Sequence, residues 1–451
     1  MILRKDRGAC NLIRPPFLLC PYLFVASIIV KMKKCSLRFR LTVLVCFGAA
    51  LAGCGGSRTA SPKDPAKLGV RISPEGTKAA EPAIVADAAG NALVAYVEHN
   101  GKAGDLFIQK LDRNGKLEGD RVRVNPSAGE AKAWKGDPPV LAVGADGTIF
   151  VSWTRALPDP EARGNDLVLS ISKDSGHSFG APVKINDDEK PASHGMHSLA
   201  VDDSGRVFAA WLDERNIKYE EHSTKTAGAA MHHEEKEPNS EVYYSYSRDG
   251  GKTFLPNRKI ATEVCPCCKT AVLAASDGTV YVSWRQVLKD DFRHIAVSHS
   301  NDSGETFSPG VIVSDDKWQI NACPVSGASM ASGGPQTLEV LWFAGGTEGD
   351  LGIYFTRSTD GGRTFDARTI VDDNAIGGTP VLLTNGSKPT AVFTGADERV
   401  YSIETNDTPT DGEATAIADG SLPSATYLNG KLATAFVRNT NSKSEVWFVV
   451  S

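Results

Sequence analysis

Several common signatures are missing from this sequence of 451 residues. No run of apolar residues reaches the roughly 20 that a membrane-spanning helix needs. Helical periodicity of apolar residues is nearly absent, which argues against a helical or mixed fold. There is no Gly-x-Ser-x-Gly, no glycine-rich phosphate loop and no His-Glu-x-x-His. These absences exclude the serine-hydrolase elbow, the nucleotide-binding loop and the zinc-protease helix that such motifs mark.

An excess of basic residues is missing as well. The chain has 49 Lys and Arg against 54 Asp and Glu, which gives a net charge of −5. Residues 1–53 hold nine of the basic residues and only one acidic residue, so the rest of the chain carries −13. A negative chain is repelled by the phosphates of nucleic acids. We therefore expect no nucleic-acid partner.

The N-terminal segment has the layout of a secretory signal. Basic residues that follow Met32 precede an apolar core over residues 41–51, and small residues close it. The string Leu51-Ala-Gly-Cys54 resembles a bacterial lipobox, in which Cys54 is the lipidated residue. Translation is expected to begin at Met32. The resemblance, with Gly55 after the cysteine, implies a lipid anchor in the cell envelope at the outer membrane, so that a membrane is an expected partner.

The chain is therefore predicted to have three parts. Residues 1–53 form the export leader, and residues 54–66, which are rich in small and polar residues, form a flexible tether. Residues 67–451 form one large domain. Its strands are short and separated by turn residues, which predicts an all-β fold.

One pattern, Ser-x-Asp-x-Gly-x-x-Phe, occurs four times in this domain. Each copy lies between two short strands, which predicts a tight turn. The Asp carboxylate can accept turn amides, Gly can adopt a positive φ, and Phe can cover the hairpin. The copies span residues 172–179, 247–254, 300–307 and 358–365.

This pattern resembles the Asp-box, or BNR repeat, of the sialidase-like β-propellers. The resemblance implies a β-propeller of four-stranded blades, in which the Asp-boxes join the third and fourth strands. It also implies a structural role, not a catalytic one, for four carboxylates: Asp174, Asp249, Asp302 and Asp360.

A second repeat predicts the number of blades. Strands that end in Val-x-Trp or a variant recur seven times, as in Val151-Ser-Trp153. We therefore predict seven blades, with six as the alternative. The last unit has only three strands, and the isolated N-terminal strand over residues 67–73 is expected to complete it. Such closure would remove an exposed sheet edge.

The unusual residues fall on one rim of the predicted propeller. The link from the outer strand of one blade to the inner strand of the next lies on the rim opposite the Asp-boxes. Three successive links should therefore bring two histidines and four cysteines to the mouth of the central channel. They are His194, His197, Cys265, Cys267, Cys268 and Cys323.

Three interpretations of the four cysteines are open. In an oxidising compartment disulfides are expected, with Cys323 linked to one of the other three. Thiolates and imidazoles also suit copper or zinc, which would be the cofactor, and His232 and His233 in a polar insertion could add to the donor set. The third interpretation is a redox pair for thiol exchange.

The resemblance to sialidases also implies a second kind of site. Sialidases hold the substrate carboxylate with three arginines and use a Tyr–Glu nucleophile and an Asp acid. Planar guanidinium groups suit a carboxylate. The early Arg-Ile-Pro of the family is missing here. The catalytic candidates are Asp213, Arg215 and Arg285, and a local ion pair between Asp213 and Arg215 is the structural alternative.

Together these observations favour an exported, lipid-anchored binding protein over an enzyme. Its ligand would be a small molecule, a metal or a glycan, held at the Cys/His cluster at the channel mouth. The first alternative is a glycoside hydrolase of the exo-α-sialidase type. The second is a surface scaffold for a protein partner, with the cysteines as braces.

Overall fold

The structure is a computed structural model that describes residues 69–159, 161–218, 238–320, 322–346, 351–386, 388–405, 413–440 and 443–451. Residues 64–451 form one compact unit. The export leader, the lipidation site, the tether and the histidine-rich insertion lie outside the described ranges and stay predictions. Within those ranges, no helix is long and apolar enough to cross a membrane.

Antiparallel strands make up most of the described chain, and within each sheet most strands that follow each other in sequence pair with each other. The first sheet contains β2 (Ala79–Ala86), β3 (Ala92–Asn100), β4 (Ala103–Leu111) and β5 (Leu117–Arg123). The second sheet contains β6 (Ala131–Lys132), β7 (Val140–Val143), β8 (Ile149–Ala156), β9 (Asn165–Ser172) and β10 (Val183–Lys184).

The next two groups of four strands form one continuous sheet. They are joined at the pairing of Val264 with Gln286. The first group contains β11 (His194–Val201), β12 (Val207–Asp213), β13 (Ser240–Ser247) and β14 (Arg258–Val264). The second contains β15 (Ala271–Ala274), β16 (Val280–Val287), β17 (Arg293–Ser300) and β18 (Val311–Ile312), with the 3-10 turn η1 (Lys289–Asp291) between β16 and β17.

The last sheet combines the two ends of the domain. Two four-stranded sheets precede it in the sequence. One contains β19 (Ala328–Gly334), β20 (Thr337–Ala344), β21 (Gly352–Ser358) and β22 (Thr369–Asp372). The other contains β23 (Val381–Asn385), β24 (Lys388–Thr394), β25 (Arg399–Glu404) and β26 (Thr415–Asp419). The last sheet contains β27 (Ser421–Leu428), β28 (Lys431–Thr440), β29 (Lys443–Val450) and β1 (Val70–Arg71). In it, Val70 of β1 pairs with Phe448 of β29.

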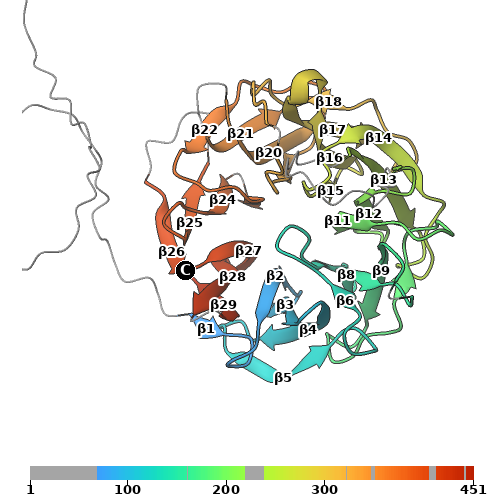
Figure 1. The fold of residues 1–451 in the computed structure, drawn as a ribbon. Helices are drawn as coiled ribbons and strands as arrows, with labels where there is room; N and C mark the ends of the chain where they lie inside the picture. The colour runs from blue at the N-terminus through green and yellow to red at the C-terminus, as the bar shows by residue number, and fades with distance from the viewer. Residues whose placement is uncertain are drawn as a thin grey trace, which may run out of the picture. The chain divides into compact units, whose positions relative to one another are not determined.

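The sheets surround a common centre, as Figure 1 shows. The strands nearest the centre contact one another in the order β2, β7, β11, β15, β19, β23 and β27, and β27 also contacts β2. The loops at the ends of these inner strands therefore lie near one another although they are far apart in the sequence. This arrangement brings together the linkers that carry the histidines and cysteines.

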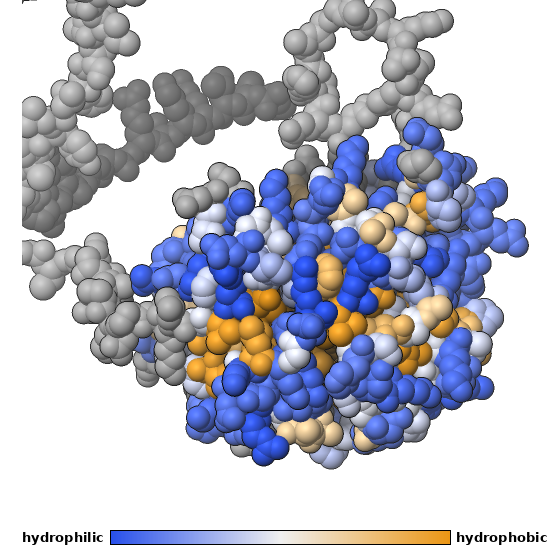
Figure 2. All heavy atoms as spheres, turned by 90° about the horizontal axis from the view of Figure 1, so that it is seen from below, coloured by the Kyte–Doolittle hydropathy of each residue, from blue (hydrophilic) through white to orange (hydrophobic). Residues whose placement is uncertain are grey.

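The apolar core lies between neighbouring sheets. One cluster packs Leu93 and Leu106 of the first sheet against Val151 and Trp153 of the second. The aromatic residues of the Val-x-Trp repeat, such as Trp211 and Trp342, are fully buried. The described core is divided into several clusters, most of which join two neighbouring groups of strands, so the fold adds small cores instead of one large one. Figure 2 shows hydrophilic residues over most of one side, with apolar residues grouped in its middle.

The four Ser-x-Asp-x-Gly-x-x-Phe turns, called Asp-box turns here after the pattern they resemble, have one shared geometry. In the first, Asp174 accepts hydrogen bonds from the Ser178 amide at 2.9 Å and from the Ser172 hydroxyl at 2.7 Å. Gly176 has a φ of +86°, a backbone conformation that other residues resist. The other three boxes repeat these bonds. Each carboxylate thus stabilises its own turn.

Candidate functional site

Four cysteines lie in two neighbouring linkers between sheet units. Cys265, Cys267 and Cys268 follow β14, and all three are buried. Cys323 precedes β19 and is exposed. A backbone hydrogen bond ties the first linker to β16, because the Cys265 amide donates to the Arg285 carbonyl at 2.9 Å. The linker then turns at Pro266, where the Cys268 amide donates to the Cys265 carbonyl at 3.4 Å.

The sulfur atoms form a close group. Cys267 is joined to Cys323 by a disulfide, whereas Cys265 and Cys268 are free thiols. The Cys265 Sγ lies 3.3 Å from the Cys268 Sγ and 3.7 Å from the Cys267 Sγ. Among the described residues, the sulfur atoms of these three cysteines form the one group of three or more metal-type ligand atoms that lie within 4.8 Å of one another.

Two buried arginines surround this group with positive charge. Arg293 Nη1 donates to the Cys265 Sγ at 2.9 Å. The hydrogen bond with Cys268 and the charges of Arg293 and Arg285 lower the pKa of the Cys265 thiol to about 6. Burial instead raises the pKa of the Cys268 thiol. The pair therefore favours one thiolate and one neutral thiol near neutral pH.

The two predicted histidines do not join the sulfur atoms. The His197 Nδ1 lies 2.8 Å from an Asp137 carboxylate oxygen. The His194 Nε2 lies 3.0 Å from Asp188 and 3.5 Å from Asp213. Although burial lowers the pKa of His194, these carboxylates raise it above its ordinary value overall. The structure thus divides the six predicted ligands into a sulfur group and two histidine–carboxylate pairs.

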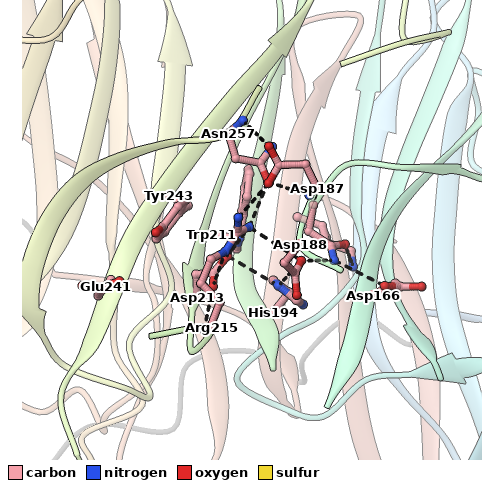
Figure 3. A network of polar contacts seen from close by, with 12 residues as sticks. Asp166, Asp187, Asp188, His194, Trp211, Asp213, Arg215, Glu241, Tyr243 and Asn257 are labelled. Atoms are coloured by element: carbon pink, nitrogen blue, oxygen red, sulfur yellow. Dashed lines mark hydrogen bonds and ion pairs between the residues drawn. The ribbon is translucent and has the colours of Figure 1, made fainter. Parts of the chain in front are cut away.

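Asp213 and Arg215 belong to a buried network that Figure 3 shows. Asp213 is fully buried and accepts hydrogen bonds from Trp211 Nε1 and Arg215 Nη2, each at 2.8 Å. Arg215 also donates to Asp187 at 2.6 Å and stacks over the Tyr243 ring. This is the local ion pair that was the structural alternative, and it holds the strand end in place.

Arg285 is occupied elsewhere. Its fully buried guanidinium donates to the carbonyls of Ser326 at 3.0 Å and Phe343 at 2.8 Å. It also lies 5.0 Å from the centre of the Trp318 ring. Asp213, Arg215 and Arg285 therefore do not converge on one surface, and Arg285 joins β16 to the linker at Ser326 and to β20 at Phe343.

A cavity of about 500 Å³ opens beside the sulfur group. Its walls include Trp134, Lys132, His194, Met196 and Pro266. Pro266 lies between two of the cysteines, and Met196 packs in the same core cluster as their side chains. The cavity therefore reaches the linker that carries the buried cysteines at Pro266, and no cysteine side chain of the described ranges lines it.

The tight turn at Trp134 was missed in the sequence. The Asp137 amide donates to the Trp134 carbonyl at 2.7 Å, which closes a four-residue turn. A Cβ built on Gly136 would lie only 2.8 Å from Val325 Cγ1, so this loop of the second sheet reaches the linker that carries Cys323. The Lys-Gly pair after Trp134 was the available signal for a turn. The position of the Trp134 turn near the cysteine linkers depends on contacts between residues far apart in the sequence.

Comparisons with known proteins assign no family. No family model and no curated protein match the chain. A protein of unknown function from Dyadobacter fermentans is 15% identical, with a TM-score of 0.49 over 84% of this chain and 96% of that chain. A PL25 ulvan lyase is 13% identical, with a TM-score of 0.49 over 74% and 79%. The Hadza microbial sialidase Hz136 is 14% identical, with a TM-score of 0.45 over 78% and 74%. At these values the similarities assign no activity to this chain.

Proposed function

We propose that this chain is an exported, lipid-anchored β-propeller of seven blades that binds copper(I) through its cysteine cluster. One observation carries the proposal. Three buried sulfur atoms, those of Cys265, Cys267 and Cys268, lie within 4.8 Å of one another beside two guanidinium groups. Cys265 and Cys268 are free thiols, and Cys267 can join them as a donor once its disulfide is reduced. The closed order of contacts among the inner strands supports the blade number and the closure by β1.

Copper(I) suits this donor set better than zinc does. Thiolate and thioether sulfur are soft donors, which copper(I) prefers and which support two- or three-coordinate binding. Zinc in structural sites takes four ligands, commonly with histidine among them. In the described part of the chain, neither a histidine nor a carboxylate lies in the sulfur group. Met196, in the same core cluster, offers a further soft donor nearby.

The local charge also favours a bound cation held by thiolates. Two thiolates around one copper(I) carry a net charge of −1, which is costly in a buried site unless it is compensated. Arg293 lies in direct contact with Cys265, and Arg285 is buried close by. The arginines would therefore stabilise the loaded site. The surrounding core excludes most of the water.

The sialidase alternative has less support from the geometry. It requires an acid and several arginines that converge in one pocket. Asp213 is fully buried beneath Trp211 and Arg215, and Arg285 donates to backbone carbonyls. These side chains are already saturated by partners in the protein. A purely structural scaffold would not need two adjacent free thiols.

The test is a titration of the reduced, full-length protein with copper(I) under anaerobic conditions, in competition with a coloured copper(I) chelator. We expect stoichiometric binding that is lost in the double variant Cys265→Ser/Cys268→Ser. The exposed His177 lies in an Asp-box, so His177→Gln is the matched control and should bind like the wild type. Equal binding by the double variant and the wild type would refute the proposal.

A further inference from the structure

The disulfide joins two sulfur atoms that differ sharply in exposure. Cys323 is exposed, whereas Cys267 is only 4% exposed. From this difference we propose that Cys323 is the point at which an external dithiol reduces the bridge, and that the reaction releases Cys267 into the buried cysteine cluster. In thiol–disulfide exchange, the attacking thiolate reacts with the sulfur atom that it can reach from solvent. The solvent-facing sulfur is Cys323.

The exchange balances in two steps. A thiolate of the external dithiol attacks the Cys323 Sγ, so that a mixed disulfide forms and the Cys267 Sγ leaves as a thiolate. The second thiol of the reagent then attacks its own sulfur in the mixed disulfide, and Cys323 leaves as a thiolate. The reagent ends as a cyclic disulfide, and two electrons have passed to the protein. Two protons, released by the dithiol, are available to the two new thiolates.

The buried side of the bridge is suited to the leaving group. The Cys267 Sγ lies 3.7 Å from the Cys265 Sγ. Arg293 is in direct contact with the Cys265 Sγ. A thiolate that is expelled inward therefore lies beside Cys265, whose own negative charge is paired with Arg293. Attack from outside on Cys267 would instead have to pass the atoms that bury it. Access therefore favours attack at Cys323.

The consequence for metal binding rests on the proposed function. The Cys267 sulfur cannot be part of a disulfide and donate as a thiolate at the same time. With the bridge closed, the free thiols are Cys265 and Cys268. With the bridge open, Cys267 adds a third thiolate to the group within 4.8 Å. The bridge thus acts as a redox control on the number of sulfur donors.

The direction of exchange can be tested with a monothiol, which stops the reaction at the first step. The oxidised, metal-free, full-length protein is incubated with reduced glutathione, quenched with acid, alkylated and digested with trypsin. Lys269 separates the two linkers, so the peptides that hold Cys267 and Cys323 are distinct. We expect glutathione on Cys323 and none on Cys267. In urea, where both sulfurs are accessible, both should be labelled.

Two results would overturn this assignment. One is glutathione attached to Cys267 in the native protein. The other is a bridge that resists dithiothreitol until the protein unfolds, as followed by circular dichroism. A cyclic dithiol product and a free Cys323 after dithiothreitol treatment of the native protein would support it. A protein dithiol in place of dithiothreitol then shows whether the linker also admits a macromolecular reductant.

The link to copper is tested separately. Copper(I) affinity is measured for the oxidised wild type, the reduced wild type and Cys323→Ser, in which the bridge cannot form. We expect the oxidised form to bind about tenfold to hundredfold more weakly than the other two. Equal affinity in all three would refute the redox control, while no binding in any of them would refute the proposed function. The reduced wild type keeps the test valid if Cys323→Ser does not fold.

Discussion

At the scale of single residues, Arg293 is a buried charged group in direct contact with the cysteine cluster. Its Nη1 contacts the Cys265 Sγ at 2.9 Å. Such a contact favours the thiolate, because a nearby positive charge stabilises the ionised form. The hydrogen bond with Cys268 is the largest cause of the lowered pKa of Cys265, and the charge of Arg293 lowers it further.

We predict that Arg293→Met raises the pKa of Cys265 from about 6 towards its ordinary value. Fewer thiolates are then present at neutral pH, because the substitution removes the positive charge and keeps an apolar side chain. The measurement is the ultraviolet absorbance of the thiolate as a function of pH. Arg293→Lys, which keeps the charge, should retain most of the shift. An unchanged titration in Arg293→Met would contradict the assignment.

The Asp-box carboxylates give a second prediction at this scale. Hydrogen bonds from the Ser178 and Ser172 hydroxyls lower the pKa of Asp174 to about 2, and similar bonds do so for Asp249 and Asp302. A lowered pKa in the folded state means stability that is present above the ordinary pKa of 3.8 and is lost as the pH falls towards 2. The free energy of unfolding should therefore decrease over this range.

Thermal unfolding at several pH values measures this effect. In Asp174→Asn the part of the acid dependence due to that residue should be missing, and stability at neutral pH should fall by about 1 kcal/mol, since a charge-assisted hydrogen bond becomes a weaker one. The exposed Asp203, whose side chain is not part of a box, offers the control Asp203→Asn. An identical acid profile in the wild type and Asp174→Asn would contradict the prediction.

At the scale of elements, the N-terminal strand is the critical one. β1 pairs with β29, and the adjacent Ile72 is 5% exposed in a core shared with Phe448 and Tyr96. Without this strand, β29 would present unpaired backbone groups at a sheet edge. The same short segment thus fills a core and covers an edge.

We predict that Ile72→Ala lowers the free energy of unfolding by about 2–5 kcal/mol, because it leaves a cavity in this core. The neighbouring Val70 is 38% exposed, so Val70→Ala is the matched control and should change stability far less. Urea denaturation, followed by tryptophan fluorescence, gives both values. Similar losses in the two variants would show that the strand does not pack as described.

The sequence predicted these elements well because their signals are local. An Asp-box needs only Ser, Asp, Gly and Phe at fixed spacing, and each bond in it joins residues at most four positions apart. The linker that carries Trp134 was not predicted as part of the site. Its contact with Val325 joins positions far apart in the sequence, and such contacts leave no periodic signal.

At the scale of the whole molecule, the fold decides which unusual residues share a site. Cys267 and Cys323 are 56 positions apart and form a bridge. His194 begins β11, in the unit that precedes the cysteine linkers, and faces Asp188 and Asp213. The rim prediction placed the histidines and cysteines in adjacent linkers. It did not contain the direction of each side chain, so it merged groups that the structure keeps apart.

The sequence by itself determined an all-β chain, the four Asp-box turns, the extra N-terminal strand and the linkers that carry the cysteines. Those features depend on residue types at short spacings, where local hydrogen bonding and strand periodicity decide the outcome. Only the tertiary structure decided that Cys267 pairs with Cys323, that Arg293 faces Cys265 and that Arg285 donates to backbone carbonyls. These contacts are set by how neighbouring sheets pack, and packing is a property of the whole molecule.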